Sequence, residues 1–542
     1  MLANLKSYLE KIQVTPISWI IGISGVLMVR FFLESLSSPT SSGFFSSDAS
    51  TLIHYYLFLM ASAVVFMIFL QVFIPSWKSV IPQLVAISFS AIFIAPVVDW
   101  LVSGGKGLRM LYLFDSPKGM LFSFLSFTNK SFNDSATIGL QIELASLIIF
   151  SGLLIYFVNK NWKRAITSVL VLYVIIFILS SSPGIVSIIG GGSNPAQNYF
   201  GQPSFFIQKS IENSATIPNN IHSSLKYSST VRMFEIAFNF MMGRIIFLIL
   251  VIFTTAWFYL NLKEKFKAMV GNFRLGRTAH FILMIFFGLF VAYMKFPSTT
   301  LNWNDWLAVI ILCLAFYFSG TFAICVNDIV DEDVDRISNT DRPLVKNSLN
   351  KEDMKQAAVI FLTASFLAGF LAGYTAFFFV LAFTALYYIY SAPPTRFKLI
   401  PFFSSFIIGL CSLTAVMAGF FFLSPDKHVS VFPPRVALMV VVALSLLTGI
   451  RDIKDIEGDK KAGIKTVPII FGDVWGVRVV GFLAGLSYIL IPVFLGINIL
   501  FVAAIPCALA TYYFANKKPY KEKFIFMIYF AFILVSALLI FI

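Results

Sequence analysis

The chain has 542 residues, of which 58% are hydrophobic, 17% aromatic and only 12% charged. Soluble domains carry about 25% charged residues, so this chain has too few to cover a water-exposed surface. The composition argues against a disordered chain, a disulfide-stapled secreted module and an ordinary cytosolic enzyme, and it predicts an all-α protein that crosses a membrane many times.

The formal net charge is +14, from 40 basic and 26 acidic side chains. Such an excess can indicate nucleic-acid binding, but basic residues also gather on the cytoplasmic loops of multispan membrane proteins. We favour the second explanation and expect membrane lipid, and no nucleic acid, around the protein.

Apolar runs of about 20 residues, the length that crosses the hydrocarbon layer, divide the chain into two parts. The first part, residues 1–262, has six such runs, near residues 17–35, 52–75, 80–103, 137–158, 165–182 and 235–261. A basic connector, residues 263–278, follows. The second part, residues 279–542, has nine, near residues 279–295, 305–326, 355–373, 374–390, 400–423, 435–450, 474–495, 496–515 and 524–542.

The distribution of Lys and Arg predicts the orientation of these spans. If the N-terminus lies in the cytoplasm, the loops that fall inside carry most of the basic residues. We therefore expect a multi-pass integral membrane protein with a cytoplasmic N-terminus and an external C-terminus. The difficult region is 355–390, where two short helices must share 36 residues.

Acidic residues concentrate in two short windows, each directly after a predicted span. The windows NDIVDEDVD (327–335) and RDIKDIEGD (451–459) hold nine of the 26 acidic residues, and both fall on the predicted cytoplasmic side. Carboxylates crowded at a membrane boundary repel one another, and burying each in the membrane costs roughly 2.5–3.5 kcal/mol. They therefore need a neutralising partner.

The spacing within the windows indicates what that partner is. Asn327, Asp331 and Asp335 stand four residues apart and would share one face of a helix, and Asp455 and Asp459 repeat the step. Two such helix ends facing each other would form an oxygen cage of the kind that Mg²⁺ prefers when it also holds phosphate oxygens.

Basic residues accompany the acids on the same predicted face. They are Arg336, Arg342, Arg451, Lys460, Lys461 and Lys465, together with Arg396 and Lys398 in the loop YSAPPTRFK (390–398). Acids for a metal and bases for an anion indicate a diphosphate site. Ordinary solvated helix caps would explain one acidic run better than two matched runs. An acidic ring of a cation channel would leave the flanking bases unexplained.

At these residues the sequence resembles the UbiA-type intramembrane prenyltransferases. The family's N-D-x-x-D-x-x-x-D motif is matched by Asn327, Asp328, Asp331 and Asp335, and its D-x-x-D-x-x-x-D motif by Asp452, Asp455 and Asp459. Its R-P-L element and Y-S-x-P-P-x-R-x-K loop are matched at 342–344 and 390–398. The resemblance covers about residues 279–542 and implies a nine-helix prenyltransferase bundle. Where the family commonly has Gly after R-P-L, this chain has Asn347, which tolerates left-handed backbone.

The resemblance also implies an activity, which is Mg²⁺-dependent transfer of an isoprenyl group from a prenyl diphosphate donor to a hydrophobic acceptor, with release of diphosphate. The implied acceptor is a lipid ether similar to geranylgeranylglyceryl phosphate, or an aromatic quinone precursor. Two alternatives remain: phosphoribosyl transfer to a polyprenyl phosphate, and a non-enzymatic transporter or scaffold with the same fold.

The resemblance assigns roles to particular residues. The implied catalytic residues are Asp331, Asp335, Asp455 and Asp459. The implied magnesium site contains these four together with Asn327, Asp328 and Asp452. The implied diphosphate-binding residues are Arg336, Arg342, Tyr390, Arg396, Lys398 and Lys461.

Residues 1–262 show no such resemblance. Their predicted spans contain five charged residues: Arg30, Glu34, Asp99, Glu143 and Arg244. Charges within a membrane are candidates for function, but Arg30 and Glu34 can pair one helical turn apart and Asp99 lies near a span end, so we favour a structural role. We expect an accessory domain that delivers or shields a lipid substrate, or binds a partner.

Overall fold

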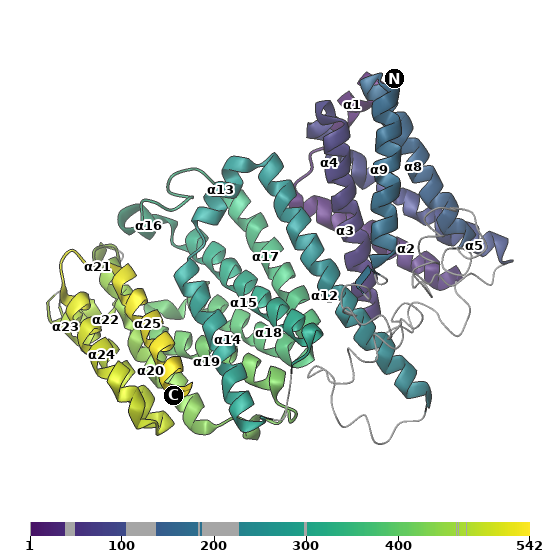
Figure 1. Cartoon of the computed structure of the whole chain (residues 1–542). Coiled ribbons are helices and arrows are strands. Elements are labelled where there is room, and N and C mark those ends of the chain that lie inside the picture. Colours follow the sequence, from purple (N-terminus) through teal and green to yellow (C-terminus); the bar gives the residue numbers. More distant parts are fainter. Residues whose placement is uncertain are drawn as a thin grey trace. The chain divides into compact units, whose positions relative to one another are not determined.

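The computed structural model describes residues 2–37, 49–104, 137–182, 185–186, 227–297, 301–461, 463, 465–472 and 474–541. Within these ranges the regular structure is helical and contains no strand (Figure 1). Fifteen helical segments are long and apolar enough to cross a membrane, six before residue 262 and nine after it, as the sequence predicts. The protein is therefore an all-α, multi-pass integral membrane protein.

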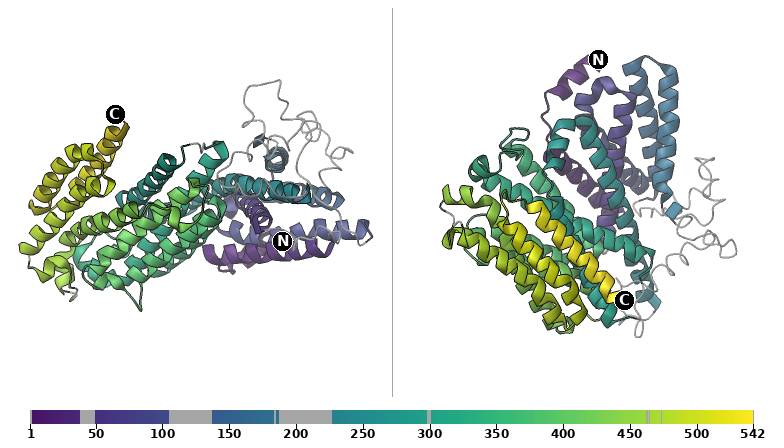
Figure 2. Two further views of the ribbon diagram at one scale, coloured as in Figure 1. Left: turned by 90° about the horizontal axis from the view of Figure 1, so that it is seen from below. Right: turned by 60° about the vertical axis from the view of Figure 1, so that its left-hand side comes forward.

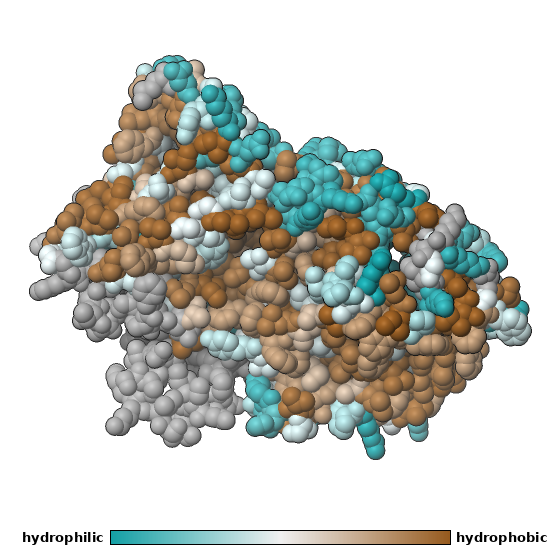
Figure 3. All heavy atoms as spheres, turned by 180° about the vertical axis from the view of Figure 1, so that it is seen from behind, coloured by the Kyte–Doolittle hydropathy of each residue, from teal (hydrophilic) through white to brown (hydrophobic). Residues whose placement is uncertain are grey.

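The outer surface of the helices is apolar. Hydrophobic residues cover broad areas of the face drawn in Figure 3. Large apolar side chains such as Ile21, Phe150 and Leu509 are 65%, 71% and 67% exposed. Exposure of this extent suits contact with lipid hydrocarbon, which does not penalise apolar surface as water does.

The described residues form two compact units. The first contains Met1–Asn261 with Asn302–Asn304, and the second contains Leu262–Leu301 with Asp305–Ile542. The helices of the first unit are α1 (Leu2–Glu10), α2 (Pro16–Ser37), α3 (Ala49–Phe73), α4 (Ile81–Ser88), α5 (Ile94–Val102), α8 (Ile138–Asn159), α9 (Trp162–Ser180) and α12 (Tyr227–Asn261). One span of this unit, Pro75–Val102, joins α4 and α5 to the 3₁₀ segments η2 (Pro75–Val80) and η3 (Phe89–Phe93).

Local sequence signals explain where two helices of the first unit, α8 and α9, begin. The Thr137 hydroxyl accepts a hydrogen bond from the Leu140 amide at 3.2 Å, and the Asn161 side chain accepts one from the Arg164 amide at 3.1 Å. Both side chains satisfy backbone donors that the first helical turn leaves free. The core of the unit is apolar, and Ile23, Leu70 and Ile155 are almost completely buried in it.

The second unit holds the nine remaining spans, which lie side by side in both views of Figure 2, coloured teal to yellow. Its longer helices are α13 (Lys263–Gly271), α14 (Leu275–Lys295), α15 (Trp303–Val330), α17 (Lys351–Ala372), α18 (Tyr374–Ser391), α19 (Phe403–Leu423), α20 (Pro434–Thr448), α23 (Trp475–Leu495), α24 (Phe501–Asn516) and α25 (Glu522–Phe541). The shorter elements are α16 (Glu332–Ser338), η5 (Phe397–Leu399), η6 (Val429–Val431), η7 (Gly449–Arg451), α21 (Asp452–Lys461), α22 (Val467–Ile470) and η8 (Asn498–Leu500).

The crowded region at 355–390 is resolved by a cap and a turn. Helix α17 begins at Lys351, earlier than expected, because Asn350 and Asp353 form a capping box, with the Asp353 amide 2.7 Å from the Asn350 side chain. The helix ends at Ala372, and the next residue, Gly373, has a φ of 140° that is available to glycine and reverses the chain into α18. Two full spans therefore fit between the cap and Ser391.

Helices α14 and α19 approach each other closely through glycine. A Cβ atom at Gly288 would overlap the carbonyl of Val416, and one at Gly419 would overlap the carbonyl of Ile285. Small residues allow such backbone proximity between membrane helices, where packing takes over the role that the hydrophobic effect has in water. This contact fixes α14, and Arg274, directly before its first residue, contributes to the site described next.

Candidate active site

The first acidic window spans a break between two helices. Helix α15 ends at Val330, and Asp331 precedes α16 with φ of −100° and ψ of 9°. The sequence predicts a single helical stripe here. Backbone hydrogen bonds from Asp331 to Asn327 (2.9 Å) and from Asp335 to Asp331 (2.8 Å) continue the four-residue step through the break. The three side chains therefore stay on one side of the chain, as the spacing predicts.

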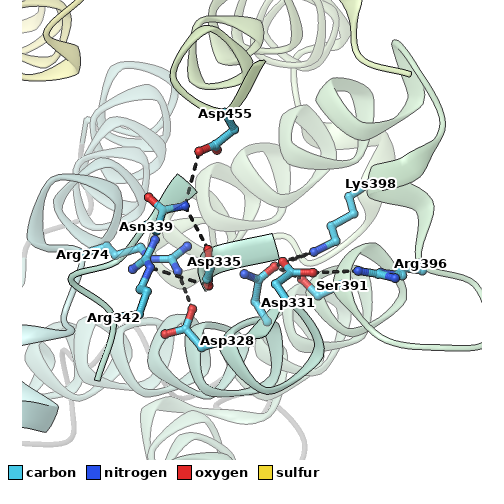
Figure 4. Close-up of polar contacts among 11 residues, drawn as sticks. Arg274, Asp328, Asp331, Asp335, Asn339, Arg342, Ser391, Arg396, Lys398 and Asp455 are labelled. Atoms are coloured by element: carbon cyan, nitrogen blue, oxygen red, sulfur yellow. Dashed lines mark hydrogen bonds and ion pairs between the residues drawn. The ribbon is translucent and has the colours of Figure 1, made fainter. Parts of the chain in front are cut away.

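Asp328 is held by residues that precede α14. Its carboxylate accepts a hydrogen bond from the Arg274 guanidinium at 2.6 Å (Figure 4). It also accepts one from the Asn272 side-chain amide at 2.8 Å. The residue is 1% exposed, so both oxygens depend on these donors. Asp328 thus anchors the end of α15 to the beginning of α14.

Asp331 faces the loop that follows α18. Its Oδ1 accepts a hydrogen bond from Arg396 at 2.8 Å, and its Oδ2 is bonded to Lys398 (Figure 4). Lys398 also donates to the Asn327 side chain at 3.2 Å. Burial lowers the pKa of Lys398, and Asp331 opposes that shift by stabilising the ammonium group. The loop cations and the first acidic window therefore form one charge cluster.

Asp335 is buried and only partly satisfied. Its Oδ1 accepts a hydrogen bond from Asn339 at 2.9 Å, whereas its Oδ2 lies 3.8 Å from Arg342 Nε, and neither of these two atoms has a hydrogen-bond partner in the described part of the chain. Burial raises the pKa of this carboxyl, since the charged form is separated from water and Arg342 compensates only in part.

Asn339 connects the two acidic windows. Its side-chain amide donates to Asp335 and also to Asp455 on α21, at 3.4 Å (Figure 4). Helices α16 and α21 pack against each other. Two windows separated by more than a hundred residues therefore face one another, as the matched motifs predict.

The remaining residues of the second window lie on α21 or at its start. Asp459 is 9% exposed and lies within electrostatic reach of Asp455, Asp452, Asp331 and Lys398. Asp452 follows η7 directly and begins α21. Tyr390, near the end of α18, contacts the ring of Tyr387 with centroids 6.2 Å apart.

One predicted diphosphate residue, Arg336, points away from this network, and another, Lys461, has no described side chain. The Arg336 guanidinium pairs with Glu332 at 2.6 Å, and its side chain is 53% exposed. Lys461 ends α21, and its side chain lies outside the described part of the structure. Arg342, Arg396 and Lys398 are the predicted basic residues that the structure brings to the carboxylates.

The donor set of the cluster fits a hard divalent cation. Among the described residues, no three acidic, histidine or cysteine side chains already converge on one point, because cations hold Asp331 and Asn339 stands between Asp335 and Asp455. The buried Asp335 Oδ2 without a donor is nevertheless a free ligand atom. The surrounding carboxylate and amide oxygens are the ligands that Mg²⁺ prefers.

Several residues of the site do not follow from the motifs. Arg274 and Asn272 lie in the basic connector, residues 263–278, where a cytoplasmic loop would be basic and polar without any role in the site. Asn339 and Ser391 are polar residues that belong to none of the motifs. Ser391 donates to Asn327 at 3.2 Å. The one available signal was the position of Asn339, four residues after Asp335.

Comparison with known proteins places this site in a family context. Residues 281–534 match the model of the UbiA prenyltransferase family. The chain is 31% identical to chlorophyll synthase of Arabidopsis thaliana over 27% of this chain and 39% of the relative. It is 27% identical to digeranylgeranylglyceryl phosphate synthase of Thermococcus sibiricus over 30% of this chain and 56% of the relative.

Solved structures are similar as well. A UbiA homologue from Archaeoglobus fulgidus bound to GPP and Mg²⁺ has 23% identity and a TM-score of 0.38, and the match covers 50% of this chain and 96% of that one. The chain thus spans between 39% and 56% of the length of the two curated relatives. Apart from Asn302–Asn304, the segment that matches the family model lies within the second unit, where the motifs predicted it.

Proposed function

Because residues 281–534 match the model of the UbiA prenyltransferase family, we propose that this membrane protein transfers an isoprenyl group from a prenyl diphosphate to a hydrophobic acceptor and releases diphosphate, in a Mg²⁺-dependent reaction. The acceptor class is a lipid ether or an aromatic quinone precursor. Chlorophyll synthase and digeranylgeranylglyceryl phosphate synthase among the relatives support a hydrophobic acceptor.

The observation that carries this proposal is the junction of the two acidic windows beside a pair of loop cations. Asn339 links Asp335 to Asp455, while Lys398 and Arg396 bond to Asp331 on the adjoining turn. Acids from two helices and bases from a third segment thus lie in one place. This is the combination that a metal-bound diphosphate requires.

In the proposed reaction Asn327, Asp331, Asp335, Asp455 and Asp459 would hold magnesium, with Asp328 and Asp452 supporting them. When bound, magnesium supplies positive charge to the departing diphosphate oxygens. Lys398 and Arg396 could replace their bonds to the Asp331 carboxylate with bonds to a diphosphate oxygen while staying in the same loop. Arg342 offers a guanidinium nitrogen without a hydrogen-bond acceptor. Fixed cations of this kind stabilise negative charge as it develops on a leaving group.

Incubation of the purified protein with radiolabelled geranylgeranyl diphosphate and Mg²⁺ tests the proposal. Geranylgeranylglyceryl phosphate and a panel of aromatic acids serve as acceptors. We expect a labelled lipid product that EDTA abolishes. Loss of a fixed charge at the reacting centre typically lowers rates by about 10²–10³-fold, so Asp331→Asn and Asp455→Asn should each lower product formation by at least that much.

A matched control comes from the same segment. Asp341 pairs with Lys346 at 2.6 Å, and its side chain is 93% exposed, so Asp341→Asn removes an acid without touching the cluster and should leave turnover unchanged. Full activity of Asp331→Asn would refute the assignment. Mg²⁺-dependent diphosphate binding without turnover would favour the phosphoribosyl reaction, and absence of binding would favour a scaffold.

We also propose that residues 1–262 form an accessory membrane domain and that the N-terminus and the acidic windows face the cytoplasm. Single cysteines at Lys346 and Asp426, in a background without the four native cysteines, test the orientation. In sealed right-side-out vesicles, a membrane-impermeant maleimide should label the cysteine at 426 and spare the one at 346. The reverse pattern would overturn the orientation.

A further inference from the structure

We infer that an exposed basic surface of the second unit binds the head groups of anionic phospholipids. This surface, which we call the basic patch, consists of Arg478 on α23 and of four lysines in and just after the turn between α24 and α25. The lysines are Lys517, Lys518, Lys521 and Lys523, and all five side chains are exposed. The inference does not depend on prenyl transfer.

The five cations lie at one end of three neighbouring helices. Helix α24 packs against both α23 and α25 (Figure 1). A Cβ atom at Gly481, three residues after Arg478, would come within 3.1 Å of the Asn516 side chain, and Asn516 directly precedes Lys517. Arg478 and the lysines of the turn therefore belong to one surface.

The basic patch differs from the other exposed cations of this unit because it lacks acidic partners. Lys265 pairs with Asp353 at 2.6 Å, and Lys346 pairs with Asp341 at 2.6 Å. Within the part of the chain that the structure describes, none of the five patch cations has an ion pair. The orientation of the spans explains why a loop is basic, but it does not explain why the cations of one loop alone are left without acids.

Nearby acids do not cancel the charge. Residues 473–523 contain five basic and two acidic side chains, so their formal net charge is +3. One of the two acids, Glu522, lies 3.6 Å from Arg277, which is outside the patch. In the second acidic window, Asp452 interacts with Arg451 and Arg277, and Asp459 interacts with Lys398. The patch therefore carries an excess of positive charge that an external anion can balance.

The apolar surface of the same helices leads to the patch. Phe482 on α23 is 60% exposed, and Leu509 on α24 is 67% exposed. Side chains of this kind face lipid hydrocarbon in a membrane protein. A lipid whose chains pack on α23 and α24 therefore has its phosphate near the end where the patch lies.

Aromatic side chains stand between the apolar surface and the cations. Trp475 is 66% exposed, and the Arg478 guanidinium lies 5.0 Å from the centre of its ring. Tyr513 is 58% exposed, and Lys517 lies 5.6 Å from the centre of its ring. Trp and Tyr concentrate where hydrocarbon meets the head groups. This position favours a lipid, and not a soluble acidic protein, as the partner of the patch.

The turn that carries the lysines is fixed from within. The Tyr520 hydroxyl donates a hydrogen bond to the carbonyl of Ile450 at 3.0 Å, and the Asn516 side chain donates one to the carbonyl of Tyr512 at 2.9 Å. The lysines therefore extend from a backbone that is already ordered, which lowers the cost of binding.

A fluorescent reporter on α24 tests the inference. The full-length protein with Leu509→Cys, in a background without the four native cysteines, is labelled with bimane and placed in phosphatidylcholine vesicles. The vesicles contain a small fraction of brominated phosphatidylglycerol or of brominated phosphatidylcholine. The ratio of quenching by these two lipids measures the local preference for an anionic head group.

Each Lys or Arg near a membrane surface strengthens the attraction of anionic lipid about fivefold, so we expect a quenching ratio of at least about five. Replacing all four patch lysines by Gln should bring the ratio close to one, whereas replacing them by Arg should preserve it. Salt at about 1 M should also lower the ratio, because it shortens the screening length to about 3 Å.

The matched control neutralises four lysines that have acidic partners. Changing Lys265, Lys267, Lys346 and Lys351 to Gln removes the same charge from the same unit and should leave the ratio unchanged. A second reporter at Phe150→Cys, on a lipid-facing position of the first unit, should not respond to the patch substitutions. Equal quenching by brominated phosphatidylcholine in all variants shows that the fold is retained.

Three outcomes overturn the inference. A ratio close to one for the unmodified protein would exclude lipid recognition and leave an acidic protein as the partner that the charge allows. An unchanged ratio after loss of the four patch lysines would assign the preference to another surface. An equal decrease in both four-lysine variants would assign it to net charge alone. Because the assay requires no prenyl donor, absence of prenyl transfer would leave its result intact.

Discussion

Substitution of Arg30 by methionine should destabilise the first unit more than any surface change. Arg30 lies on α2 and is 5% exposed. Its guanidinium bonds to Glu34 at 2.7 Å, to Glu143 at 2.8 Å and to the carbonyl of Ile92. Methionine preserves much of the side-chain volume but removes the cation that pairs with Glu143. The Glu143 carboxylate is 8% exposed, and it keeps a hydrogen bond from the Ala95 amide at 3.2 Å.

The size of the effect follows from the buried carboxylate. Breaking a buried ion pair by removing one partner costs about 3–5 kcal/mol, which lowers the folding equilibrium constant roughly a hundred- to a few-thousandfold. Adding Glu143→Gln to Arg30→Met should recover part of this loss, because a neutral amide is less costly to bury than an unpaired carboxylate. The pair therefore couples α2 to α8 through charge.

The free energy of unfolding can be measured by SDS titration in mixed micelles, followed by tryptophan fluorescence. The matched control is Lys6→Met, which removes an exposed pair with Glu10 at 3.9 Å and should cost less than about 1 kcal/mol. A loss below about 1 kcal/mol for Arg30→Met, or no recovery on adding Glu143→Gln, would refute a structural role and return these charges to the list of functional candidates.

Two further substitutions probe the second unit. Gly288→Ala should cost about 1–3 kcal/mol in the same titration, because its Cβ would overlap the Val416 carbonyl, whereas Gly320→Ala, with open space at its Cβ, should be neutral or stabilising. Equal effects of the two would show that α14 and α19 separate easily. Asn347→Val should cost about 1–2 kcal/mol, because Asn347 has a left-handed φ of 55°, whereas Asn347→Gly should be tolerated. Both effects can be measured by thermal inactivation of prenyl transfer. A valine variant as stable as the unmodified protein would contradict the expected backbone strain.

Local sequence signals predicted the spans and the spacing within the site. Hydropathy and length fix a transmembrane helix because the bilayer requires both. The four-residue steps from Asn327 to Asp335 are local, and the structure keeps them even though the helix breaks at Asp331. The left-handed backbone at Asn347 is also local, and the prediction is confirmed.

Local sequence signals could not predict the contacts between segments that are distant in the chain. Arg30 and Glu34 were predictable as one helical turn, but Glu143 lies 113 residues from Arg30 and joins them only through packing. In the same way, nothing in the first acidic window indicates that Arg274 will bind Asp328, 54 residues away. Several basic residues near each window were chemically equivalent candidates, and only packing selects among them.

The bonds of the first acidic window differ in when they can form during synthesis. Arg274 precedes Asp328, so the partner of that carboxylate is already present when α15 emerges. Arg396 and Lys398 follow Asp331 by 65 and 67 residues, and Asp455 follows Asn339 by 116. A ribosome making this chain therefore completes α17 and α18 before the charge on Asp331 has its partners, and reaches α21 before the two acidic windows can meet. Truncation between α16 and Arg396 leaves the Asp331 carboxylate without the two cations that hold it, and truncation between Lys398 and α21 leaves Asn339 without its link to Asp455.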